Sequence, residues 1–192
     1  MLLFISVIFN LLVQPISAIF VDSSTLLHHV SAGQDTKQLV QLIQTMPRSA
    51  INAVDSRHAT PLHYAAQFGS IENIAELFKA GADLEVKKEY GLTALALAVM
   101  HGRSEIVQFL CSLGADLNAQ SSSGGTALHF SLELDQRQDS VGIVDILIRY
   151  GACLWTPNNE GKTPVDIANI ESSEAGNFLL DHVERLRVRI GK

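Results

Sequence analysis

Apolar and polar positions recur along most of the chain with the period of an α-helix. After Thr60, apolar or small residues occupy positions i, i+3, i+4 and i+7, which are Leu62, Ala65, Ala66 and Gly69. This spacing predicts a helix with one narrow buried stripe. A second apolar group, such as the one at 106–110, predicts a second helix that ends at a Gly-Ala pair, where glycine supplies the left-handed residue. The predicted unit is helix, turn, helix and extended loop.

This unit recurs at a fixed spacing. Successive units each contain a threonine, and these threonines are 33, 33 and 37 residues apart, namely Thr60, Thr93, Thr126 and Thr163. The last two of these spacings also separate the helix-ending glycines, which are Gly81, Gly114 and Gly151. A period of this size is typical of solenoids, in which each unit buries its apolar face against its neighbours. One unit therefore contains four additional residues between its threonine and its glycine.

Each of these threonines is predicted to cap the first helix of its unit. Its hydroxyl accepts a hydrogen bond from a first-turn N–H, and a proline at the first helical position, such as Pro61, loses no hydrogen bond there. A polar side chain at the third helical position reaches back to the cap, and this position holds His63, His129 and Asp166. We therefore interpret both histidines as structural.

The units resemble the ankyrin repeat. The family pattern is matched in the second unit by Asn52-Ala53, Asp55, residues 60–63, Ala65-Ala66, Gly69 and residues 81–83. His58 stands where the family usually has glycine, at a position of positive φ that His adopts more readily than a β-branched residue. The third unit has Lys88 in the Asp position and lacks both Pro and His, so a weaker cap is expected. The fifth has Trp155 in the Asn position.

The resemblance implies an all-α ankyrin-repeat solenoid of about five helix-turn-helix units with extended loops, over residues 22–187. A looser first unit precedes Asn52, and end units are commonly atypical because they cap the stack. The additional residues are expected between the helices of the fourth unit, at 134–139, with Ser140 capping the next helix. A closing helix is expected after Gly176, with a short basic tail at 188–192.

The N-terminal segment is apolar and carries no charge before Asp22. Residues 2–13 have the length of a signal-peptide core and are too few for a membrane-spanning helix, which needs about 20 residues. Pro15 and the small residue Ala18 predict cleavage after position 18, although no Lys or Arg precedes the apolar run. We expect a cleaved signal peptide at 1–18, membrane contact only during export, and an extracytoplasmic protein that is periplasmic or secreted. The alternatives are an uncleaved membrane anchor and a buried apolar cap.

The composition is that of a folded, acidic protein. The chain has 192 residues and a mass of 20.9 kDa, and 47% hydrophobic against 18% charged residues exclude wholesale disorder. The formal net charge of -6 argues against an interface with a phosphate backbone, so nucleic acid is not an expected partner. Cys111 and Cys153 lack the spacing of a zinc site and are expected to be free thiols, too far apart to pair.

The sequence contains no motif that indicates catalysis or cofactor binding. The run at 121–126 lacks the lysine of a phosphate loop, and the adjacent His28 and His29 lack the i, i+4 spacing of a metal pair. A nucleophile elbow is also absent from the sequence. We expect no enzyme activity, no cofactor, no metal and no small-molecule substrate. An enzyme or thiol-redox protein that uses Cys111 or His101 is the alternative of a different class.

The resemblance implies that a partner protein binds the concave surface, which we define as the loop tips and the exposed side of the first helices. The residues expected to contact the partner are Arg57, Phe68, Tyr90, Leu92, Met100, His101, Leu134 and Ile170. Apolar side chains at solvent-facing positions favour an interface. The interpretation is an exported, non-catalytic protein-interaction module, and a secreted effector that binds a host protein is its narrower form.

Overall fold

The computed structural model describes residues 23–33, 35–134, 139–170 and 173–190. Throughout these residues the regular secondary structure is helical, without strands. The α-helices are α2 (Ser23–Ser31), α3 (Thr36–Thr45), α4 (Pro61–Phe68), α5 (Ile71–Lys79), α6 (Ala94–Met100), α7 (Ser104–Ser112), α8 (Ala127–Leu132), α9 (Ser140–Arg149), α10 (Pro164–Ile170) and α11 (Glu174–Ile190). Two short 3₁₀ helices, η1 (Arg48–Ala50) and η2 (Glu89–Gly91), lie in the connecting loops.

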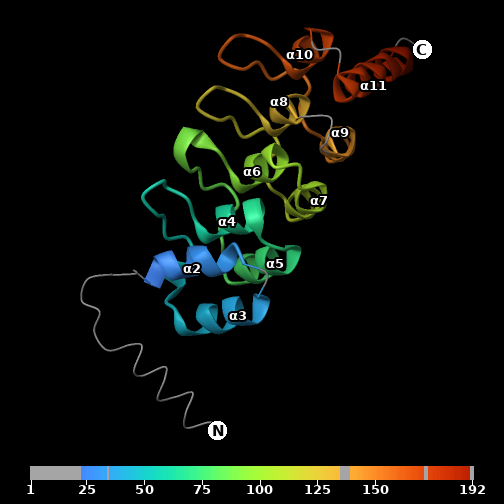
Figure 1. Ribbon diagram of the computed structural model, residues 1–192. Coiled ribbons are helices and arrows are strands. Elements are labelled where there is room, and N and C mark those ends of the chain that lie inside the picture. The colour runs from blue at the N-terminus through green and yellow to red at the C-terminus, as the bar shows by residue number, and fades with distance from the viewer. Residues whose placement is uncertain (1–22, 34, 135–138, 171–172, 191–192) are drawn as a thin grey trace, which may run out of the picture.

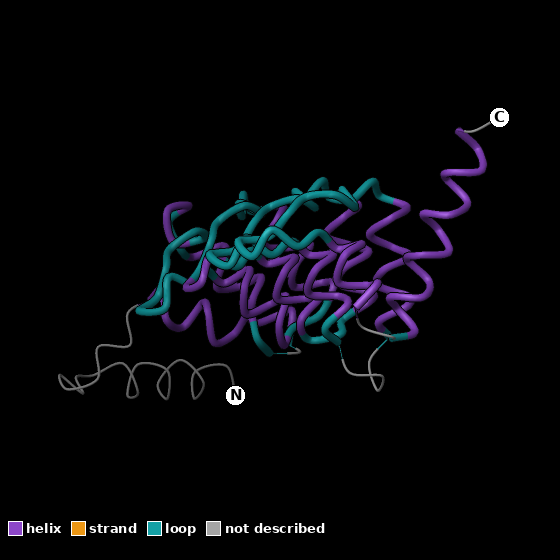
Figure 2. Tube along the Cα trace, turned by 90° about the horizontal axis from the view of Figure 1, so that it is seen from above, coloured by secondary structure: helices purple, strands orange, loops and turns teal. Residues whose placement is uncertain are grey.

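The helices form two layers, stacked as five pairs (Figure 1). The first helices of the pairs contact one another in the order α2, α4, α6, α8 and α10, and the second helices in the order α3, α5, α7, α9 and α11. The loops between pairs lie together along one side of the stack (Figure 2). The expected all-α solenoid is confirmed.

In each of the second to fifth units, one apolar side chain two residues after the capping threonine lies in the core. These side chains are Leu62, Leu95, Leu128 and Val165, and all are buried. Fully burying such a side chain contributes about 1.5–3 kcal/mol. Buried alanines beside them, such as Ala65 and Ala98, allow the first helices to approach closely. The predicted apolar stripe is therefore the contact face between neighbouring units.

His63 caps its helix as predicted and also joins two units. Its Nδ1 accepts a hydrogen bond from the Thr60 backbone N–H at 3.0 Å, which leaves Nε2 to donate to the Leu92 carbonyl oxygen at 3.1 Å. His129 makes the same two contacts, with Thr126 at 3.1 Å and with Lys162 at 3.1 Å. The contact with the following loop was not predicted from the sequence.

The atypical first unit is held to the second by two buried polar side chains. Nε2 of His28 lies 2.7 Å from the Ala59 carbonyl oxygen, so His28 makes the same kind of contact as His63. Asn73 is fully buried, and its Nδ2 donates to the Gly33 carbonyl oxygen at 2.7 Å while its Oδ1 accepts from the Thr36 hydroxyl at 2.8 Å. Neither role is predicted by the repeat pattern.

Two predicted helix boundaries are wrong. Asp139, not Ser140, caps α9, because Asp139 Oδ1 accepts the Gly142 N–H at 3.0 Å and Ser140 is already helical. The closing helix α11 begins at Glu174 and continues to Ile190, so residues 188–190 belong to this helix and not to a tail. Figure 1 shows α11 projecting beyond the stack at its C-terminal end.

The four additional residues lie where they were predicted, between the helices of the fourth unit. Residues 133–139 separate α8 from α9, whereas only 101–103 separate α6 from α7, which is a difference of four. Positions 135–138 of this segment are outside the described residues, as are the predicted signal peptide and its cleavage site. Within the described ranges, no helix is both long enough and apolar enough to cross a membrane.

Candidate protein-interaction surface

The loop tips on the concave surface are tied to one another by backbone hydrogen bonds. The Glu89 N–H donates to the Arg57 carbonyl oxygen at 3.0 Å, and the Ser122 N–H donates to the Tyr90 carbonyl oxygen at 2.8 Å. The Asn159 N–H continues the series to the Ser123 carbonyl oxygen at 3.0 Å. These bonds fix the loops before any partner arrives, which lowers the entropic cost of binding.

Positive φ angles shape the loop tips. His58 has φ 55°, as predicted for its place in the repeat. Tyr90 and Gly91 have consecutive positive φ angles of 63° and 68°, which was not predicted for Tyr90. A positive φ is unusual for a residue with a side chain. In this conformation the Tyr90 side chain is 77% exposed at the tip of the third loop.

Most of the predicted contact residues are exposed on the concave surface. Phe68 and Met100 end helices α4 and α6 and are 45% and 41% exposed, as expected for residues off the buried stripe. Arg57 and His101 are also exposed, and Ile170 at the end of α10 is 67% exposed. The structure thus brings Phe68, Met100 and His101 together on two neighbouring units and places Ile170 two units away.

Leu92 and Leu134 are corrections to the predicted set of exposed contact residues. Leu92 is only 9% exposed and packs with Ala96, Leu97 and the partly buried Phe130 between the third and fourth units. Its carbonyl oxygen accepts the Lys88 N–H at 2.9 Å, which closes the loop and turns the Leu92 side chain inward. Leu134 is half-buried and packs against the main core. The exposed apolar side chains of the concave surface are therefore not continuous along the stack.

His101 connects the first helices of the second and third units. Its Nδ1 donates to the Leu97 carbonyl oxygen at 2.9 Å, which leaves Nε2 to accept from the Gln67 amide at 2.9 Å. The rings of Phe68 and His101 meet edge to face with their centroids 6.2 Å apart. This arrangement holds Phe68 in place on the concave surface.

A small pocket opens beside α4. Arg57 and Lys88 from two successive loops line it together with Tyr64, Gln67 and Phe68, which share one side of α4 through their i, i+3 and i+4 spacing. Its volume of about 90 Å³ is small beside the roughly 300–1,000 Å³ of pockets for drug-sized ligands. The pocket therefore admits a single small group.

Asp55 is bonded to Tyr64, one of the residues that line this pocket, and neutral donors occupy both of its oxygens. Its Oδ2 accepts the Tyr64 hydroxyl at 2.6 Å, and its Oδ1 accepts the backbone N–H groups of Arg57 at 2.8 Å and Ala59 at 2.9 Å. Burial acts to raise the pKa of Asp55, but these hydrogen bonds outweigh it and hold the pKa below its usual value. The hydrogen bond between the Tyr64 hydroxyl and Asp55 also raises the pKa of Tyr64.

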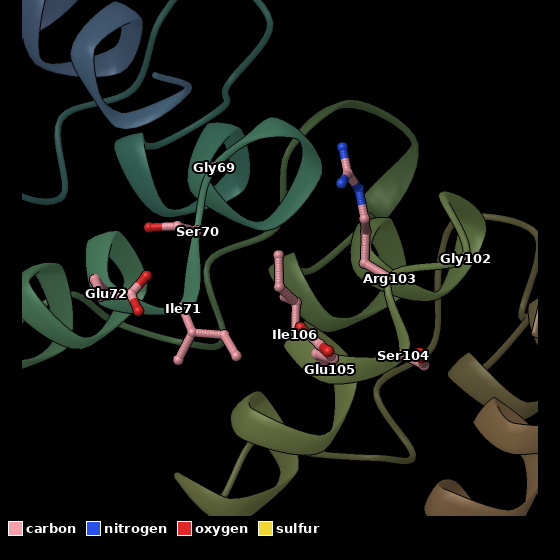
Figure 3. A pocket seen from close by; sticks show the side chains of 9 residues that line it. All are labelled: Gly69, Ser70, Ile71, Glu72, Gly102, Arg103, Ser104, Glu105 and Ile106. Atoms are coloured by element: carbon pink, nitrogen blue, oxygen red, sulfur yellow. The ribbon is translucent and has the colours of Figure 1, made fainter. Parts of the chain in front are cut away.

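A larger groove lies at the turns between the paired helices of the second and third units. Figure 3 shows its lining around Ser70, Glu72, Arg103, Ser104 and Glu105, at the starts of α5 and α7. Two exposed carboxylates oppose one arginine there, so the groove has no net attraction for anions. Arg103 was not among the residues predicted from the sequence.

The fold agrees with a comparison to known families. The family model described as ankyrin repeats (3 copies) matches residues 6–88 and again residues 26–121, which together cover more than half of the chain. The chain belongs to the ankyrin-repeat family. Ankyrin repeats generally mediate protein–protein interactions. The matches end at residue 121, before the helices of the fourth and fifth units, which the structure shows to be further helix pairs of the same kind.

The first match begins at residue 6, inside the segment that we expect to be a signal peptide. The match and that expectation give residues 6–18 different roles, as part of an ankyrin repeat or as a leader that is removed. Sequencing of the mature N-terminus distinguishes them.

The two cysteines of this ankyrin-repeat protein are free and lie in different environments. Cys111 is buried in α7, and burial raises the pKa of its thiol to about 11. Cys153 is exposed, and hydrogen bonds from the Thr156 hydroxyl and from the backbone of Trp155 lower the pKa of its thiol. Because the thiolate is the reactive form, Cys111 is a poor nucleophile at neutral pH.

Proposed function

We propose that this ankyrin-repeat protein is a non-catalytic module that binds a partner protein through its concave surface. The observation that carries the proposal is the pair Phe68 and Met100, two large apolar side chains exposed at the ends of neighbouring first helices. Aromatic residues and methionine are enriched at the centres of interfaces. The exposed Tyr90 on the adjacent loop extends the same surface.

A protein partner fits this surface better than nucleic acid or a small molecule. The chain has a formal net charge of -6, whereas affinity for a phosphate backbone comes mainly from Lys and Arg. The pocket on the concave surface is too small for a drug-sized ligand. A few large apolar anchors that dominate the binding energy are typical of protein–protein contacts.

The binding proposal is tested by Phe68→Ala combined with Met100→Ala. A partner is captured with the tagged protein, identified by mass spectrometry and then titrated against both forms. Truncating interface hot spots costs about 2 kcal/mol or more, so we expect affinity to fall at least about tenfold. The melting temperature should barely change, because exposed substitutions usually shift stability by within about 0.5 kcal/mol.

Leu62→Ala is the matched control for stability. Leu62 is 1% exposed, and truncating a buried leucine costs roughly 2–5 kcal/mol. If the double substitution melts the protein as strongly as Leu62→Ala does, Phe68 and Met100 have a packing role. If it leaves the affinity of the verified partner unchanged, the concave surface is not the binding site.

We further propose that the protein is exported and that its signal peptide is cleaved after Ala18. The support is the uncharged apolar run at 2–13, followed by Pro15 and a small residue at the cleavage position. Binding to a host protein, as a secreted effector, is a narrower form of the proposal that depends on this step. Protein recovered from its native host should begin at Ile19; an intact Met1 in a soluble cytoplasmic fraction would contradict export.

A further inference from the structure

The pocket beside α4 is basic in a protein that is acidic overall. Arg57 and Lys88 are its charged lining residues, and no carboxylate lines it. The ion pairs formed among the described residues join other side chains, at positions 76–79, 145–149, 160–162 and 184–187. Both cations are therefore available to a carboxylate from outside the chain.

Arg57 and Lys88 are held close together by a backbone hydrogen bond between their loops. The Glu89 N–H donates to the Arg57 carbonyl oxygen at 3.0 Å, so the two loops are side by side at Arg57 and Lys88. His63 and Lys88 both line the pocket. Burial is the main cause that lowers the pKa of His63, and the charge of Lys88 adds to it. Asp55 keeps its negative charge and acts on His63 and Tyr64 in the pocket lining. Both of its oxygens already accept hydrogen bonds from neutral donors, so they are not free to pair with the two cations.

An apolar anchor adjoins this basic pocket. Phe68 lines the pocket itself, and Met100 is exposed at the end of the neighbouring first helix. The pocket therefore places positive charge beside exposed apolar area.

We propose that the partner presents an acidic segment to the second and third units. A side-chain carboxylate of Asp or Glu enters the pocket between Arg57 and Lys88. A large apolar side chain beside it in the partner's sequence packs against Phe68 and Met100. This inference rests on the proposed binding function and adds the chemistry of the partner, because charge-assisted hydrogen bonds to Arg are directional and select a carboxylate.

The test uses a displayed library of random short peptides, selected on the immobilised full chain. We expect enriched peptides to share an Asp or Glu next to a leucine, isoleucine, methionine or aromatic residue. One enriched peptide is then synthesised with a fluorescent label, and its affinity is measured by anisotropy. Arg57→Ala with Lys88→Ala should weaken it about tenfold or more, and added NaCl should also weaken it.

Lys79→Ala with Arg149→Ala is the matched control. It removes the same number of positive charges from exposed positions on the second helices α5 and α9, and it should leave peptide affinity unchanged. Replacing the peptide's carboxylate by the corresponding amide should weaken binding to the unsubstituted protein but not to Arg57→Ala with Lys88→Ala. That result would assign the carboxylate to the pocket.

Three outcomes would overturn the inference. The first is the absence of enriched peptides, and the second is enrichment of neutral or basic peptides. The third is an acidic peptide that is insensitive to Arg57→Ala with Lys88→Ala. A peptide that depends on Phe68 and Met100 but not on the two cations refutes the inference and leaves the proposed function standing. A peptide that depends on neither pair refutes both.

Discussion

Nε2 of His63 lies 3.1 Å from the carbonyl oxygen of Leu92, so the side chain that caps α4 also holds the loop of the third unit. The same contact explains why Leu92 is buried: its backbone is fixed against α4, and its side chain packs between the third and fourth units. His63 is 2% exposed, and burial is the main cause that lowers its pKa to about 4. Neutral His63 is therefore part of the folded state.

The low pKa of His63 predicts a loss of stability in mild acid. The folded pKa of about 4 is below the usual 6.5, so the unfolded chain binds the proton more tightly. The stabilisation from His63 is complete above pH 6.5 and falls by about 3 kcal/mol as the pH drops to 4. Urea unfolding measured from pH 7 to pH 4 should show this loss. His63→Gln should be less stable at pH 7, but its free energy of unfolding should change less with pH. Equal pH dependence in the two proteins would contradict the prediction.

Two glycines with the same backbone conformation should respond differently to substitution. Gly124 and Gly161 have φ angles of 77° and 76°, but only at Gly124 would a Cβ meet the next loop, 2.6 Å from the Asn159 backbone nitrogen. Gly161→Ala should cost about 1–2 kcal/mol for the left-handed conformation alone. Gly124→Ala should cost about 1–3 kcal/mol more, because the loop must move. Urea unfolding of both variants tests this. Equal losses in the free energy of unfolding would mean that the next loop moves away from the new Cβ at no cost.

The two cysteines should differ in reactivity toward a thiol reagent at neutral pH. Cys153 is exposed and has a lowered pKa, whereas burial raises the pKa of Cys111 to about 11. We expect one thiol to react in the folded protein and the second only after unfolding. Cys153→Ser should abolish the fast reaction. A fast reaction of Cys111 in that variant would contradict the prediction and favour the alternative of a thiol-redox protein that uses Cys111.

Deletion of residues 135–138 should leave the ankyrin stack intact. The connection between α8 and α9 would then have the length of that between α6 and α7, and Asp139 would remain to cap α9. Surface connections tolerate changes in length well. Circular dichroism and a melting curve should match those of the full chain within a few degrees. A collapsed or strongly destabilised variant would show that the segment contributes to packing.

The sequence by itself determined the repeat, its helices and most of its caps. The threonine caps, the histidines at the third helical position and the helix-ending glycines act within one unit, so their chemistry is visible in a few consecutive residues. The positive φ of His58 followed from the same local pattern. The exposure of Phe68 and Met100 followed from their positions off the apolar stripe.

The tertiary structure decided what happens between units. Leu92 is buried because the backbone of its loop is held against α4, and Leu134 is half-buried against the core. The bonds of Asn73 to the first unit and the meeting of Arg57 with Lys88 join residues that are 31 or more positions apart. The periodicity of one unit determines which face is apolar, but side-chain contacts across units depend on how the units stack. For this reason the candidate surface could be located from the sequence, whereas its basic pocket became visible only in the fold.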